Sequence, residues 1–267
     1  MNRKRFLLTG LLAATAAFAG LVSPVFAQGT PFKVGVTPGP HAQIMEVVKE
    51  VAAKDGLDIE VIEFSNYAIP NQALAAGEID ANSFQHKPYM DNQVENQGFD
   101  LVSVADTILF PMGLYSKQVG SVAEIGQGAR IGIPNDPTNG GRALLLLQEQ
   151  GLIELAEGAG LSATPLDIKG NPLNIEIVEL DAAQMPRALD ELTAGIVNNN
   201  YALSAGLRPD RDAIAVEGDT SPYANIIAVR AADKDSENVV KFLRAYFSPE
   251  VKKYIEETFG SSVRALW

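Results

Sequence analysis

The chain has 267 residues, a formal net charge of −12 at pH 7 and no cysteine. The negative charge disfavours binding to nucleic acid or anionic membranes, and the lack of cysteine excludes disulfide bonds and thiolate chemistry. Only two histidines, His41 and His86, are present, too few for a histidine-rich metal site. We therefore expect a protein with neither a metal nor a cofactor.

The first 27 residues have the pattern of a secretory signal peptide. Basic residues at positions 3–5 precede an apolar stretch that ends at Val22, and small residues precede a cleavage site after Ala27. A membrane anchor is the alternative, but the apolar stretch is short for a membrane span, which needs about 20 residues. We expect residues 1–27 to be cleaved off, leaving a chain long enough for two lobes.

Strand and helix patterns alternate along the rest of the chain. Strands are predicted at 32–36, 57–64, 79–84, 129–133, 174–180 and 194–197. Helices are predicted at 41–54, 70–77, 88–97 and 142–148, after Asp181, near Asp235 or Ser236, and from Ser248.

This alternation is typical of an α/β fold. The extended stretch 99–115 leads from one group of elements into the next. We therefore predict an α/β, two-lobed architecture, with residues 28–114 and 226–267 in the first lobe and 115–225 in the second. Ligands of such sheets bind beyond the carboxyl ends of the strands, which predicts a ligand cleft between the lobes.

Arg142 is the clearest candidate for a ligand contact. It follows two glycines, at 140–141, in the first turn of a predicted helix. Free N–H groups, the helix dipole and the guanidinium group favour a carboxylate or a phosphate, and the glycines let the backbone approach a ligand. The alternative is an exposed arginine paired with a surface acid. Neither glycine-rich nucleotide motif is present, so a nucleotide is not expected.

Asparagines at strand ends form a second group of candidates. Asn198 ends a predicted strand, and Asn225 lies where the chain returns to the first lobe. An amide can donate to a carboxylate and accept from an ammonium, as an amino-acid backbone requires. Asparagine is also common in turns, which is the alternative reading. Asn200 competes with Asn198 for the same role.

Aromatic and imidazole side chains gather near the strand ends of the first lobe. They could line a pocket for a thioether, since sulfur contacts aromatic rings favourably, or they could belong to an ordinary core. The group comprises Tyr67, Phe84, His86 and Tyr89.

No catalytic group emerges from the sequence. There is no GxSxG or HExxH motif and no cysteine nucleophile. Glu78 and Asp80 share a strand face, but nothing nearby would separate their pKa values as acid–base catalysis requires. We therefore expect a protein that is not an enzyme.

Several segments resemble the methionine-binding lipoprotein family of the NlpA type. They occur in order across nearly the whole chain after the signal peptide, at 34–41, 80–89, 133–147, 179–187 and 221–225. The resemblance implies a periplasmic-binding-protein fold that closes on methionine and delivers it to the membrane permease of an ABC importer with its ATPase. It implies that Arg142 holds the α-carboxylate, helped by Asn198 and Asn225, while the aromatic group surrounds the side chain. We expect a monomer.

Two departures from the family pattern affect these expectations. Many members carry a lipid on an N-terminal cysteine, and this chain has no cysteine, so we expect a periplasmic protein that is not lipid-anchored. Ser83 stands where the family often has an aromatic residue, which could alter selectivity. Two alternatives stay open. The same scaffold could bind a methionine-containing dipeptide or another apolar amino acid, or the chain could be a surface interaction protein.

Overall fold

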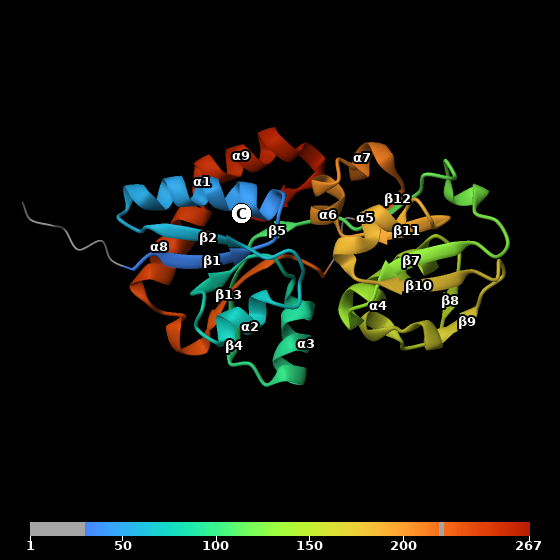
Figure 1. The fold of residues 1–267 in the computed structure, drawn as a ribbon, viewed down its shortest axis with the longest axis horizontal. Coiled ribbons are helices and arrows are strands. Elements are labelled where there is room, and N and C mark those ends of the chain that lie inside the picture. The colour runs from blue at the N-terminus through green and yellow to red at the C-terminus, as the bar shows by residue number, and fades with distance from the viewer. Residues whose placement is uncertain (1–29, 219–221) are drawn as a thin grey trace, which may run out of the picture.

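The structure is a computed structural model that describes residues 30–218 and 222–267. The predicted signal peptide, residues 1–27, lies outside the described residues. Two lobes lie side by side, each built around a five-stranded sheet with helices packed against it (Figure 1). Within the described ranges, no helix is both long and apolar enough to cross a membrane.

The first sheet takes strands from both ends of the chain, in the order β2-β1-β3-β13-β4. Strand β1 pairs in parallel with β2 and β3, whereas β13 runs antiparallel to β3 and β4. The strands are β1 (Phe32–Val36), β2 (Ile59–Glu63), β3 (Ala81–Asn82), β4 (Leu101–Asp106) and β13 (Ile226–Arg230).

Helices cover both faces of this sheet (Figure 1). One face carries α1 (Pro40–Lys54), α8 (Glu237–Tyr246) and α9 (Pro249–Phe259), and the other carries α2 (Pro70–Ala75) and α3 (Lys87–Gln97). Ser236 and Ser248 are the N-caps of α8 and α9, because each side chain accepts a hydrogen bond from the backbone N–H three residues later. Ile44, Val48 and Ala52 repeat at helical spacing on α1 and are buried in the core against β1.

The second sheet has the order β10-β7-β11-β6-β12. Its central strand β11 is parallel to β7 and antiparallel to β6. Helix α4 covers one face, and α5, α6 and α7 lie towards the other (Figure 1). The elements are β6 (Gly113–Tyr115), β7 (Arg130–Pro134), α4 (Pro137–Glu149), β10 (Glu176–Leu180), α5 (Met185–Ala188), β11 (Ala194–Val197), α6 (Asn199–Ser204), α7 (Pro209–Asp212) and β12 (Ala213–Val216).

Two short antiparallel pairs complete the topology. Strand β5 (Ile108–Leu109) pairs with β14 (Arg264–Ala265), and β8 (Glu154–Leu155) pairs with β9 (Ile168–Gly170). The antiparallel strands β6 and β13 each follow directly on a crossing of the chain between the lobes (Figure 1). These crossings place the ends of both sheets next to one cleft. The lobe limits given above stay a prediction, and β6 spans the limit set at 114.

Helix α4 begins earlier than the sequence pattern indicated. Its N-cap is Asp136, whose side chain accepts the backbone N–H of Asn139, and Pro137 takes the first helical position. Arg142 therefore lies in the second turn rather than the first, and the prediction of a first-turn arginine is wrong. This places the guanidinium group away from the helix end, so the dipole argument does not apply to it.

Candidate ligand-binding site

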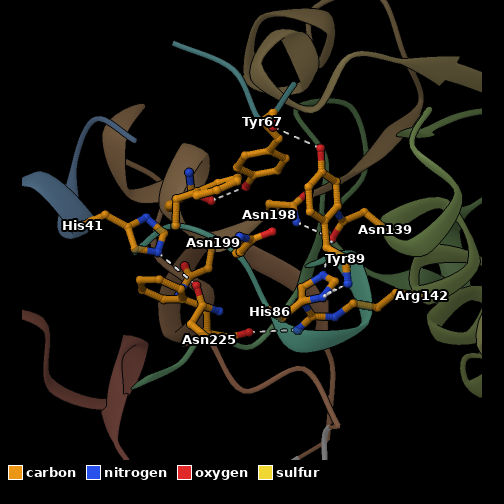
Figure 2. A pocket seen from close by; sticks show the side chains of 13 residues that line it. His41, Tyr67, His86, Tyr89, Asn139, Arg142, Asn198, Asn199 and Asn225 are labelled. Carbon is orange, nitrogen blue, oxygen red and sulfur yellow. Dashed lines mark hydrogen bonds between the residues drawn. The ribbon is translucent and has the colours of Figure 1, made fainter. Parts of the chain in front are cut away.

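A cavity lies between the two lobes and takes its lining from both. All seven residues predicted to contact a ligand line it: Tyr67, Phe84, His86, Tyr89, Arg142, Asn198 and Asn225. Asn200, the alternative to Asn198, also lines it, together with five residues that were not predicted to contact a ligand: His41, Gln85, Phe110, Asn139 and Asn199. Two kinds of wall result: a ring wall of Tyr67, Phe84 and Tyr89, and an amide wall of asparagines with Arg142. Figure 2 labels Tyr67 and Tyr89 of the ring wall, and Asn139, Asn198, Asn225 and Arg142 of the amide wall.

The ring wall joins the two lobes. Tyr67 follows β2 and lies 5.8 Å from Phe84, 6.0 Å from Tyr89 and 5.0 Å from Tyr201 of α6, between ring centroids. The hydroxyl of Tyr89 donates to the Tyr67 carbonyl at 3.0 Å (Figure 2). Burial raises the pKa of Tyr67 and Tyr89 above their usual value, so these phenols are uncharged and the wall is apolar with polar tips.

Arg142 is 4 % exposed and held on three sides. Its Nε donates to Glu217 Oε1 at 3.0 Å, its Nη2 pairs with the other Glu217 oxygen and donates to the Phe110 carbonyl at 2.8 Å, and its guanidinium carbon lies 4.2 Å from the centre of the Tyr223 ring. Nε and Nη2 are thus committed to protein partners. Among the described contacts, Nη1 is the nitrogen that remains for a ligand.

Glu217 was not predicted, and no local pattern could have revealed it, because it is 75 positions from Arg142 in the sequence. The bidentate pairing resembles the ion pair that the alternative reading of Arg142 required. The pair is largely buried, however, with side chains 4 % and 15 % exposed. It therefore orients the arginine inside the protein rather than on its surface.

The N-terminus of α4 does not offer the anion site expected from its glycines. Asp136 already places a carboxylate there. A Cβ on Gly141 would lie 2.4 Å from the Leu161 carbonyl, and one on Gly140 would lie 3.0 Å from the Pro134 carbonyl. The two glycines are therefore required for packing against protein backbone, and the expectation that they admit a ligand is wrong.

A chain of hydrogen bonds runs along the other polar side of the cavity. Tyr67 donates to Asn200 Oδ1 at 2.6 Å, and Asn200 Nδ2 donates to Thr37 Oγ1 at 3.3 Å. Thr37 bonds His41 Nδ1 at 2.8 Å, and His41 Nε2 bonds Asn225 Oδ1 at 3.0 Å. The chain joins residues of both lobes and turns the Asn225 amide nitrogen away from His41.

Both histidines of the cavity are neutral near pH 7. Burial lowers the pKa of His41 to about 4. Burial, together with the charge of Arg142, lowers the pKa of His86 to about 3. No group of three or more histidine, cysteine or acidic side chains that could hold a metal ion occurs in the part of the chain that the structure describes. The site is therefore built from neutral rings, amides and one arginine.

The family model described as NlpA lipoprotein matches residues 32–267. The chain belongs to the NlpA lipoprotein family. It is similar to the "Probable D-methionine-binding lipoprotein MetQ" of Vibrio cholerae, at 47% identity over 266 residues that cover 97% of this chain and 99% of the relative. It is also 47% identical over 238 residues to the D-methionine-binding lipoprotein MetQ of Escherichia coli K12, covering 88% of each chain.

A solved structure extends the likeness to three dimensions. It is a nutrient binding protein from Burkholderia cenocepacia bound to methionine, with 52% sequence identity and a TM-score of 0.87, covering 88% of this chain and all of that one. The predicted two-lobed periplasmic-binding-protein fold and the resemblance to the NlpA family are both confirmed by these comparisons.

The expectation of a protein that is not lipid-anchored is contradicted. The relatives are named lipoproteins, both as MetQ and as Lipoprotein 28 of Escherichia coli. That expectation rested on a single feature, the lack of cysteine in the sequence, whereas the family is named for lipid attachment and the match to it spans both lobes. The prediction of an unanchored protein is therefore withdrawn.

Proposed function

We propose that this protein binds methionine in the cavity between its lobes and is the substrate-binding component of an ABC importer. The observation that carries the proposal is the pairing of a ring wall with a wall of amides and one arginine in a single buried cavity. The relatives named or titled for methionine support the same ligand.

The amide wall has a side that donates hydrogen bonds and a side that accepts them. Nη1 of Arg142 and the amide nitrogen of Asn225 are donors and would bind the α-carboxylate. Asn198 Oδ1 is buried and has no partner among the described residues, so Asn198 would accept from the ammonium group rather than assist the carboxylate. Both amide atoms of Asn200 are engaged by Tyr67 and Thr37, which favours Asn198 over Asn200.

The ring wall would hold the thioether. Tyr67, Phe84 and Tyr89 surround this end of the cavity, and His86 lies beside Tyr89 with 6.2 Å between ring centres. Sulfur–ring contacts contribute about 0.3–1.5 kcal/mol each. This wall would therefore favour methionine over an aliphatic side chain of the same length.

The proposed mechanism is closure of the two lobes around the ligand. Residues 28–114 with 226–267 and residues 115–225 would move as two bodies, and contacts from both would stabilise the closed state. The closed protein, as a monomer, would then dock on the importer's permease, whose ATPase drives uptake. Binding and delivery need no bond-making step, so we propose no enzymatic activity.

A thermal-shift panel tests the ligand. The protein would be unfolded, freed of small molecules, refolded and heated with L-methionine, D-methionine, norleucine, leucine and a methionyl dipeptide. A ligand that binds the folded state raises its stability by RT ln(1 + [L]/Kd), so methionine is expected to give the largest rise at the lowest concentration. A larger rise with the dipeptide or with leucine would contradict the proposal.

A further inference from the structure

The carboxylate of Asp136 lies directly behind the amide wall of the cavity. Its Oδ1 accepts from the backbone N–H and the side-chain Nδ2 of Asn139, at 2.9 and 3.0 Å, and its Oδ2 accepts from the same Nδ2 at 2.9 Å. An N-cap needs only the backbone bond. The two bonds to the side chain have no part in capping, and they fix which end of the Asn139 amide faces the cavity.

With its nitrogen held by Asp136, Asn139 presents its oxygen to the cavity wall. That oxygen accepts from Asn198 Nδ2 at 2.8 Å and bonds His86 Nε2 at 3.1 Å (Figure 2). Asn198 uses its nitrogen in this bond, so its Oδ1 is the atom left over. Asn198 is 7 % exposed, and this oxygen has no partner among the described residues.

A second anchor fixes the same direction independently. The backbone N–H of Tyr89 donates to His86 Nδ1 at 3.1 Å. A backbone N–H is only a donor, so Nδ1 carries no proton and the neutral imidazole carries its proton on Nε2. Nε2 therefore donates to Asn139, whose facing atom must be its oxygen. The contact with Asp136 and the contact with His86 therefore require the same orientation of the Asn139 amide.

We propose that Asp136 is a positioning residue that makes this wall accept hydrogen bonds and so selects ligands that carry an ammonium group. It acts through Asn139 on Asn198, and its negative charge adds to the attraction for a cation. This inference rests on the proposed function, because it assigns the ammonium end of the same site. It adds a determinant for the amino group that lies outside the cavity lining itself.

Calorimetric titration of the D136N variant tests the proposal. The probes are L-methionine and 4-(methylthio)butanoate, which has the same chain and carboxylate but no ammonium group. Asp136→Asn would place an amide nitrogen against Asn139 Nδ2, so we expect methionine binding to weaken about tenfold. Binding of the des-amino analogue is expected to change less than twofold, and an equal loss for both ligands would overturn the proposal.

The exchange variant D136N/N139D provides the rescue. It keeps the total charge and moves the carboxylate to position 139, where it can only accept from His86 and Asn198. The cap at position 136 remains an amide oxygen. We expect the exchange to restore the preference for methionine over the analogue, and a preference as low as in D136N would overturn the proposal.

Nitrogen NMR of the ligand-free wild-type protein tests the orientation without any variant or ligand. We expect His86 to be the tautomer with its proton on Nε2, and a proton on Nδ1 would overturn the proposal. The two failures are distinguishable. If wild-type protein does not bind methionine, the proposed function is wrong. If wild-type protein binds methionine but D136N keeps the same preference for methionine over the des-amino analogue, only the role of Asp136 is wrong.

Discussion

The ring wall of the cavity is held by packing between side chains that also line it, whereas Arg142 and Asn139 of the amide wall are held from behind by carboxylates. Tyr67, Phe84 and Tyr89 contact one another directly. Arg142 instead depends on Glu217, and Asn198 depends on Asp136 through Asn139. We therefore expect substitutions behind the amide wall to change recognition of the amino-acid backbone, and ring substitutions to change recognition of the side chain.

Removing Arg142 should give the largest effect. Arg142→Ala takes away a charge-assisted contact, which is worth about 1.5–3 kcal/mol, so we expect methionine binding to weaken at least tenfold in calorimetry. The variant also leaves the carboxylate of Glu217 without its partner, and breaking such a pair costs about 3 kcal/mol of unfolding free energy.

The double variant R142A/E217Q separates these two effects. Glutamine removes the unpaired charge, so we expect the melting temperature to recover most of its loss while methionine binding stays weak. Recovery of binding in the double variant would show that Arg142 supports the fold alone and does not contact the ligand.

The two buried histidines should make the protein less stable in acid. Their pKa values in the folded state, about 4 for His41 and about 3 for His86, lie below the unfolded value of 6.5. The unfolded chain therefore binds protons first, so this stability is complete above pH 6.5 and falls as the pH drops towards 4. The expected loss is about 1.4 kcal/mol per pH unit for each histidine.

Urea unfolding between pH 7 and pH 4.5 measures this slope. The His86→Asn variant should lose the contribution of one histidine and show a shallower dependence over that range. An identical slope in the variant would mean that burial and the charge of Arg142 do not hold His86 neutral.

The ring wall should give the smallest effect, and it should appear in the side-chain preference. Phe84→Leu removes a ring but keeps an apolar side chain, so we expect the preference for methionine over norleucine to fall two- to tenfold, as loss of about 0.3–1.5 kcal/mol implies. Calorimetry with both ligands measures it. An unchanged ratio would show that Phe84 has no contact with the sulfur.

Much of the fold could be predicted because local patterns determine it. The apolar spacing of α1 and the serine caps of α8 and α9 were sufficient to predict those helices. Strand β13 was not predicted, since its place between β3 and β4 depends on pairing with distant segments. Asp136 with Pro137 is a helix-start signal that was not used when a helix was predicted at 142–148, so the predicted start of α4 is too late.

The residues that face the cavity were easier to predict than the residues that hold them. Arg142 and Asn198 follow strands at positions where α/β sheets bind ligands, so position and chemistry together indicated them. Glu217 acts at a distance of 75 positions, and the orientation of Asn139 depends on which of its amide atoms meets Asp136. Neither the pairing of Glu217 with Arg142 nor the orientation of Asn139 produces a local sequence pattern that could predict it.

The most direct test of the account is calorimetric titration of the refolded, ligand-free protein with L-methionine. One site per chain is predicted, with saturable binding that is weakened at least tenfold in R142A/E217Q and strongly reduced for the des-amino analogue. A protein that is folded by circular dichroism and gives no saturable heat with either methionine enantiomer would contradict the account.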